Sequence, residues 1–223
     1  MSYPYPSYTP LQKERSLIPL YLTSSFGWRL SYDVGMELSS YCAEEHAVDL
    51  LRPLGRRWRH TQAVADTARG LASGLMPSDA KVLIAAAYLH DIGYAPKLAS
   101  TGFHPLDGAL HLQALGYKRL AGLVAHHTGA QYEARLRGLE SALAKFNDED
   151  SLISAALAYC DLVTGPCGER MIPAQRLADV EVRYGDGSSV TRGLRAAWPE
   201  LMGMVEKAEG LLQQLGSTLA QPR

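Results

Sequence analysis

The chain has 223 residues, of which 47% are apolar and 20% are charged, and its formal net charge is −1. These values are ordinary for a globular protein, and the length is sufficient for one well-buried domain. The near-neutral, interspersed charge is not typical of a nucleic-acid-binding protein, which normally clusters lysine and arginine. The short basic run at residues 56–59 leads straight into a predicted helix, and we interpret it as a solvated helix start.

No segment is predicted to cross a membrane. The longest uninterrupted apolar run, residues 82–89, is far shorter than the roughly 20 residues that a membrane-spanning helix needs. Residues 1–10 are polar, aromatic and proline-rich, so they do not resemble a signal peptide. Three cysteines without a CxxC pair fit a reducing compartment. We therefore expect a cytoplasmic protein.

Helical patterns follow one another along most of the chain. Apolar residues at helical spacing predict helices over residues 44–51, 59–75, 80–90, 106–115, 118–127, 151–161, 173–184 and 188–215. Ser78 or Asp79 is expected to cap the third of these helices, and Pro199 is expected to kink or divide the last. Residues 133–146 are more polar and predict a surface segment. Strand signals are almost absent, so the sequence predicts an all-α protein.

Three regions are expected. Residues 1–40 form an N-terminal lead-in that is partly disordered or peripheral, residues 41–185 form the main domain, and residues 186–223 form a helical extension packed on it.

Several histidines and aspartates lie in apolar helices or at their ends. His90 and Asp91 end the most apolar predicted helix, where a lone carboxylate costs several kcal/mol to bury unless it is paired or binds a metal. For this pair alone, a capping Asp91 and a hydrogen-bonded core His90 would be the better explanation. Similar positions are also held by His60, His104, His126, His127 and Asp161. Imidazole and carboxylate together suit divalent metals, and the missing thiolate spacing argues against a structural zinc site.

The order of these residues resembles the H…HD…D signature of the HD-domain superfamily, and residues 90–93 reproduce its HDIG variant. The additional histidines resemble the H…HD…H…HH…D pattern of members that hold two metals, such as cyclic-dinucleotide phosphodiesterases and diadenosine tetraphosphate hydrolases. The likeness covers roughly residues 44–184. It implies an all-α HD-domain bundle with a metal site between central helices. The implied activity is that of a metal-dependent phosphohydrolase or phosphodiesterase acting on a nucleotide or another small phosphate ester.

The resemblance also implies a set of ligands. One metal would be held by His60, His90, Asp91 and Asp161. Asp91 would bridge to a second metal, whose site His104 and His126 would complete. His127 is expected to contact a substrate phosphate, with a ligand role as the alternative, so the expected catalytic residues are Asp91 and His127. Two divalent ions, iron or manganese first and magnesium, zinc, cobalt or nickel otherwise, would supply hydroxide for in-line attack on phosphorus.

Two departures from the family pattern leave the substrate open. Tyr94 stands where many HDIG members carry lysine, and Lys97 could take that role, although a solvated lysine is the simpler interpretation. Residues 128–130 replace the GYP triplet of cyclic di-GMP phosphodiesterases.

The other candidate substrate contacts are Thr128, Arg170 and Arg176, with helix capping and surface ion pairs as the alternatives. The side chains interpreted as structural are His46, His111, Asp66 and Asp107.

Two other functions are compatible with this ligand order. One is a mixed-valent diiron oxygenase of the same fold, for which the sequence shows no clear substrate-gripping residues. The other is a non-catalytic regulatory module, which the intact ligands disfavour. The expected partner is a small phosphorylated substrate, with neither nucleic acid nor membrane. The long C-terminal helix is expected to pack on its own domain, with a homodimer as the alternative.

Overall fold

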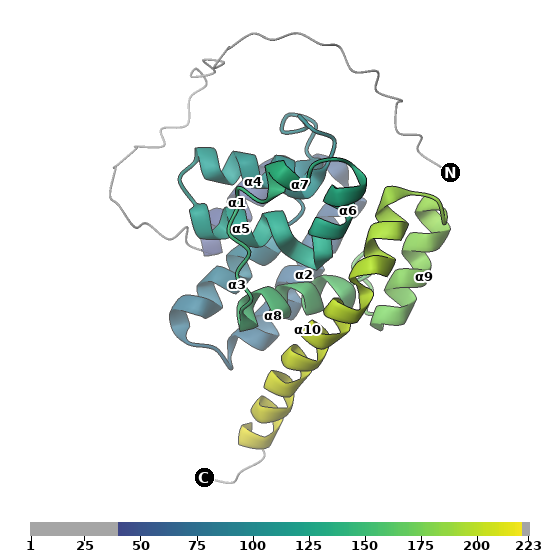
Figure 1. Ribbon diagram of the computed structural model, residues 1–223. Helices are drawn as coiled ribbons and strands as arrows, with labels where there is room; N and C mark the ends of the chain where they lie inside the picture. Colours follow the sequence, from purple (N-terminus) through teal and green to yellow (C-terminus); the bar gives the residue numbers. More distant parts are fainter. Residues whose placement is uncertain (1–39, 220–223) are drawn as a thin grey trace. The chain divides into compact units, whose positions relative to one another are not determined.

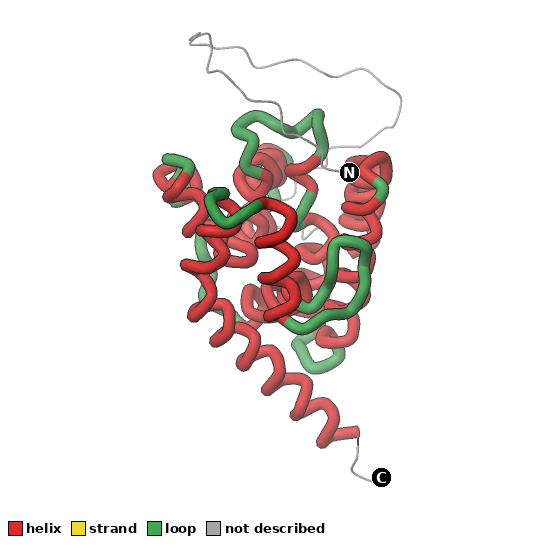
Figure 2. Tube along the Cα trace, turned by 90° about the vertical axis from the view of Figure 1, so that its right-hand side faces the viewer, coloured by secondary structure: helices red, strands yellow, loops and turns green. Residues whose placement is uncertain are grey.

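The computed structural model describes residues 40–219, and the lead-in predicted for residues 1–40 lies outside this range except for Ser40. The described chain consists of helices joined by loops, and no strand forms within it (Figure 2). The all-α prediction is thus confirmed. None of the described helices combines the length and the apolar character needed to span a bilayer.

The elements follow one another in a simple order (Figure 1). They are α1 (Ser40–Leu51), η1 (Arg52–Leu54), α2 (Arg56–Ala72), α3 (Pro77–Leu89), η2 (Ile92–Tyr94), α4 (His104–Ala114), α5 (Lys118–His126), η3 (His127–Gly129), α6 (Ala130–Leu136), α7 (Glu140–Leu143), α8 (Leu152–Leu162), α9 (Pro173–Tyr184) and α10 (Ser189–Leu219). The elements labelled η are single turns of tighter helix.

The helices α3 and α8 form the centre of the bundle. Residues 85–89 of α3 and 155–162 of α8 are buried at every position, so these stretches are covered on all sides. Both are rich in alanine, which lets neighbouring helices approach closely. Helix α3 packs against α1, α2, α5 and α8, and α8 also packs against α10. The two most buried helices therefore end next to each other within the core.

Helix boundaries follow local chemistry, with two corrections. Ser151 caps α8 by accepting hydrogen bonds from the backbone N–H groups of Ile153 and Ser154. Helix α3 begins at Pro77 itself, so neither Ser78 nor Asp79 caps it: proline suits the first turn, where no backbone donor is needed.

Pro199 does not divide the last helix, which runs unbroken to Leu219. This helix, α10, packs against α6, α8 and α9.

The region 133–146 is less peripheral than its composition predicts. It forms the end of α6 and the short α7, and Leu143 and Phe146 are buried in the core. Two apolar side chains are enough to hold this polar stretch against the bundle, because burial of each contributes roughly 1.5–3 kcal/mol.

Gly93, the glycine of the HDIG sequence, lies where η2 crosses the start of α4. A Cβ atom at this position would overlap the backbone carbonyl of His104 and the backbone nitrogen of Gly108. We expect Gly93→Ala to lower the free energy of unfolding by at least about 2 kcal/mol, because backbone cannot move aside as a side chain can. Gly70→Ala is the matched control: Gly70 is exposed in α2 with no atom near its missing Cβ. This variant should gain about 0.5–1 kcal/mol. Equal effects of the two variants in chemical denaturation would contradict the close approach.

Candidate metal centre

Three buried histidines are each oriented by a backbone carbonyl that contacts the same ring nitrogen, Nδ1. The Nδ1 atoms lie 3.0 Å from the carbonyl of Gly165 for His60, 2.8 Å from that of Ala87 for His90, and 2.6 Å from that of Val124 for His127. A carbonyl oxygen can only accept, so each Nδ1 must donate its proton. In the neutral ring, each Nε2 then carries a lone pair. Such backbone contacts fix the tautomer and the orientation of metal-binding histidines.

His90 and His127 are held by the same local device. Each directly follows a buried helix, and its Nδ1 donates to the carbonyl three residues earlier, in the last turn of that helix. Those carbonyls lack a partner within the helix. This hydrogen bond therefore orients the histidine ring and at the same time provides a donor for one of the free carbonyls at the end of the helix.

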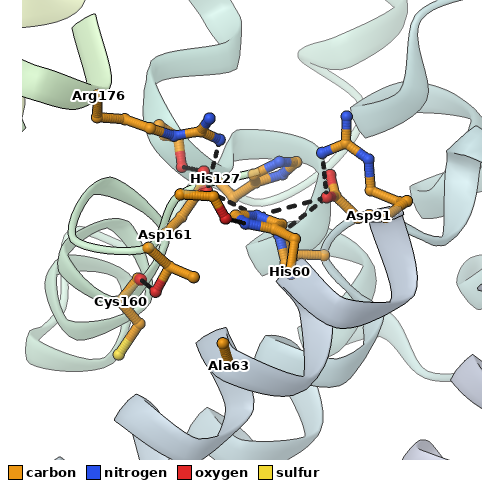
Figure 3. Close-up of polar contacts among 12 residues, drawn as sticks. His60, Ala63, Asp91, His127, Cys160, Asp161 and Arg176 are labelled. Carbon is orange, nitrogen blue, oxygen red and sulfur yellow. Dashed lines mark hydrogen bonds and ion pairs between the residues drawn. The ribbon is translucent and has the colours of Figure 1, made fainter. Parts of the chain in front are cut away.

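Two carboxylates face these Nε2 atoms (Figure 3). His60 Nε2 lies 3.1 Å from Asp161 Oδ1, and His90 Nε2 lies 3.3 Å from Asp91 Oδ2. The other oxygen of Asp91, Oδ1, lies 3.4 Å from His104 Nε2. A lone pair at this distance from a carboxylate oxygen is unfavourable unless a positive charge lies between them.

The ligand atoms fall into two groups, each within 4.8 Å: one from His60, His90 and Asp161, the other from Asp91, His104 and His127. Within residues 40–219, neither His60 Nε2 nor His90 Nε2 has a hydrogen-bond partner, although both are buried. Unpaired buried nitrogens facing carboxylates, without thiolates, fit divalent metal ions. These residues could therefore hold a metal.

Each carboxylate is also paired with an arginine. Arg57 Nη1 lies 2.7 Å from Asp91 Oδ2, and Arg176 Nη2 lies 3.2 Å from Asp161 Oδ1. Burial alone would raise the pKa of the Asp91 carboxyl, but the charges of Arg57 and His90 outweigh it and hold the pKa well below its ordinary value. The pKa of Asp161 is lowered against its burial in the same way, mainly by Arg176 and His60. Both carboxylates are therefore ionised at neutral pH.

The pKa values of the histidines are shifted in different directions by burial and by neighbouring charges. Burial lowers the pKa of His104 well below its ordinary value, and burial together with the nearby His90 lowers that of His127. Both rings are therefore neutral, as metal ligands must be. The pKa of His90 is raised instead, because the Asp91 charge outweighs its burial.

Arg57 belongs to the basic run that the sequence suggested was a solvated helix start, and this interpretation is wrong for it. The guanidinium contacts Asp91 and stacks 4.0 Å above the ring of Tyr94, which in turn stacks on His104 with ring centres 4.0 Å apart. Its position three residues before His60 could have revealed it, because this spacing places both residues on one face of α2. Tyr94, in the place of the family lysine, thus contacts a candidate ligand.

The structure places His127, rather than His126, among the candidate ligands, which was the alternative role expected for His127. His127 lies with Asp91 and His104, with its Nε2 3.3 Å from His104 Nε2. The His126 ring points elsewhere: its Nε2 lies 3.1 Å from the carbonyl of Phe146 and its Nδ1 lies 3.6 Å from Asp148. Helix α5 ends at His126, so the next residue is turned toward the opposite side of the chain. His126 is therefore not part of either group.

Thr128 contacts a candidate ligand directly. Its hydroxyl donates to Asp161 Oδ2 at 2.7 Å, and its backbone has the left-handed values φ 51° and ψ 38°. Such a conformation is unfavourable for a β-branched residue and occurs where the surroundings enforce it. Gly129, also left-handed, packs so closely on Ala197 of α10 that a side chain there would overlap it.

Two expected substrate contacts lie away from the cluster. Lys97 is exposed, and its charge acts on His46 and His111, whose rings stack with Nε2 atoms 2.8 Å apart. Arg170 is exposed and donates to the hydroxyl of Tyr159. Neither side chain lines the pocket beside the candidate metal ligands.

The residues interpreted as structural have partners outside the cluster. Asp107 is buried and accepts hydrogen bonds from Ser100, Thr101 and Gly102, which fixes the loop before α4. Asp66 pairs with Arg69 on the surface.

The cluster opens into a pocket of about 680 Å³. Its inner side is formed by Arg57, Asp91, His104, His127, Asp161 and Arg176. It is also lined by apolar residues of α9 and α10, and of these two helices the sequence connected only α9, through Arg176, with the site.

Residues 57–161 match the family model of the HD domain. The match begins at Arg57 and ends at Asp161, so it includes all the residues of both groups. The resemblance to HD domains that the sequence predicted is therefore confirmed for this part of the chain. HD domains are generally metal-dependent hydrolases. Neither the curated proteins nor the solved structures gave a match to the chain.

The contribution of the Thr128 hydroxyl to stability can be tested separately from the contribution of the side-chain shape. Thr128→Val removes the donor to Asp161 and leaves a buried acceptor with one partner fewer, so the free energy of unfolding should fall by about 1–3 kcal/mol. Thr128→Ser keeps the hydroxyl and should stay close to the wild type in the same chemical denaturation. If the serine variant loses as much stability as the valine variant, the contact with Asp161 has no special role.

Proposed function

We propose that this protein is a metal-dependent phosphohydrolase that acts on small phosphate esters through a centre of two divalent ions. The observation that carries the proposal is the convergence of buried histidine Nε2 atoms, two of them without a hydrogen-bond partner in the described residues, on two buried carboxylates. An arrangement of that kind is costly in a protein interior unless cations occupy it. The HD-domain match at residues 57–161 supports the same conclusion.

The geometry of Asp91 supports two ions rather than one. Its Oδ2 lies toward His90 and His60, at 3.3 and 3.7 Å from their Nε2 atoms, and its Oδ1 lies 3.4 Å from His104 Nε2. The two oxygens of one carboxylate thus belong to different groups. We assign His60, His90 and Asp161 to one ion, His104 and His127 to the other, and Asp91 to both.

Three helix ends also favour cations here. His90 and His127 follow the C-termini of α3 and α5, and Asp161 lies in the last turn of α8. The C-terminal end of a helix carries a partial negative charge of roughly half an electron, which attracts cations.

Divalent ions held in this way would lower the pKa of water and neutralise charge on a phosphoryl group. The protein itself would bind and orient the substrate. Arg176 lines the pocket and is buried, and within the described part of the chain its Nη1 has no hydrogen-bond partner, the nearest carboxylate being Asp179 at 3.5 Å. A free donor beside the metal groups is suited to a phosphate oxygen. Arg57 contacts the other carboxylate, Asp91, and can also bind a negatively charged phosphate oxygen.

The adjacent histidines offer a matched test. His127→Gln should lower the metal content of the purified protein from about two ions per chain to about one and reduce hydrolysis of p-nitrophenyl phosphate by about 100-fold or more, as loss of a metal-supporting residue typically does. His126→Gln should keep both properties close to the wild type, because its ring lies outside the groups. Elemental analysis and a colorimetric assay give the two readouts.

Other outcomes would identify another function. Bound metal without hydrolysis of any phosphate ester, together with oxygen consumption, would replace the proposal by the oxygenase. Protein that binds no manganese or iron, and that loses no stability in Asp91→Ala, would contradict the metal centre altogether.

A further inference from the structure

We infer that the substrate carries an apolar group, and that helices α9 and α10 form the binding site for it. This inference rests on the proposed function and adds the chemical class of the substrate. It starts from the side of the pocket that faces the metal cluster, where Val180 and Tyr184 of α9 lie with Val190 and Leu194 of α10. All four residues follow the matched HD region, which ends at residue 161.

The charged residues on this side are already paired with others. Arg183 contacts Asp179 through Nε at 2.8 Å and Nη2 at 2.6 Å. Glu133 contacts Arg137 at 2.6 Å. Because each charge is neutralised by a neighbour, neither is available to a ligand without breaking an ion pair. The wall therefore offers apolar contact rather than charge.

The wall is held in place by close packing. Val180 is buried, with 6% of its surface exposed. Helix α10 approaches α6 so closely that a Cβ on Gly193 would lie 2.8 Å from the Cβ of Glu133.

The lining of the pocket separates polar from apolar groups. The arginines and the metal groups occupy the inner side, so the phosphoryl group would bind there. The organic part of the ester would then extend toward Tyr184, Val190 and Leu194, where an aromatic ring gains the most from apolar and stacking contacts.

Binding of phosphonates to the manganese-loaded full chain tests this inference without requiring turnover. Phenylphosphonate should bind at least about tenfold more tightly than methylphosphonate, because only the former covers apolar surface. Val190→Thr should weaken phenylphosphonate about three- to tenfold and leave methylphosphonate unchanged, since threonine has nearly the same volume as valine and only replaces one methyl group by a hydroxyl. Val182→Thr is the matched control, because Val182 is 87% exposed on α9 and does not line the pocket. It should change neither affinity.

The outcomes separate this inference from the proposed function. Equal affinities of the two phosphonates in the wild type would overturn the apolar site, even if phosphate esters are hydrolysed. Selective binding of phenylphosphonate without any hydrolysis would uphold the site and reject the activity. Hydrolysis of phenyl phosphate and a nucleoside monophosphate, each compared with glycerol phosphate, then tells whether a simple aryl group or a nucleobase is the better occupant. If Val190→Thr does not fold, Tyr184→Ala replaces it, with the same selective loss expected for phenylphosphonate.

Discussion

The structure depends on the burial of two carboxylates at the ends of alanine-rich helices. Asp91 and Asp161 are both nearly inaccessible to water, with 2% and 6% of their surface exposed. A buried carboxylate without compensation is among the most costly features that a fold can contain. Each one here has an arginine and at least one histidine in contact, and each faces a buried histidine Nε2 that has no hydrogen-bond partner in the described residues. These carboxylates and histidines could hold a metal, which would complete the balance of charge.

The same constraint explains how the helices are arranged. The polar groups could not lie in the middle of α3 or α8, where neighbouring helices cover every face. His90, Asp91, His127 and Asp161 lie instead at or near helix C-termini, where free carbonyls hold the rings of His90 and His127 and the helix dipole favours positive charge. His60 and His104 lie near the starts of α2 and α4. The tight approach of η2 to α4 at Gly93 brings Asp91 and His104 together. The apolar core is thus the scaffold that fixes a polar centre.

The sequence predicted the helices best where their ends carry clear signals. Pro173 and the left-handed Gly185 bound α9 as expected, because proline suits a helix start and glycine the residue after its end. The sequence prediction placed Pro77 in the loop before α3, because proline fits a loop as well as the first turn of a helix. Leu143 and Phe146 were hidden in a polar stretch, since composition does not reveal which single side chains reach a core.

For the site, the sequence predicted the set of residues better than their roles. The roles of His126 and His127 could not be separated, because they depend on the one residue at which α5 ends. The role of Arg57 could not be distinguished from that of the neighbouring arginines, although its spacing from His60 could have indicated it. The apolar wall comes from α9 and α10, which follow Asp161 in the chain, and only tertiary packing brings it to the pocket.

Anomalous diffraction from crystals grown with manganese tests the central claim most directly. The account predicts two peaks per chain, with the two oxygens of Asp91 directed to different ions and with His127, not His126, bound to the second. A single peak with Asp91 bound through one oxygen would contradict the two-ion centre. No peak at all, with Arg57 and Arg176 alone on the carboxylates, would mean that the buried charges are balanced without metal.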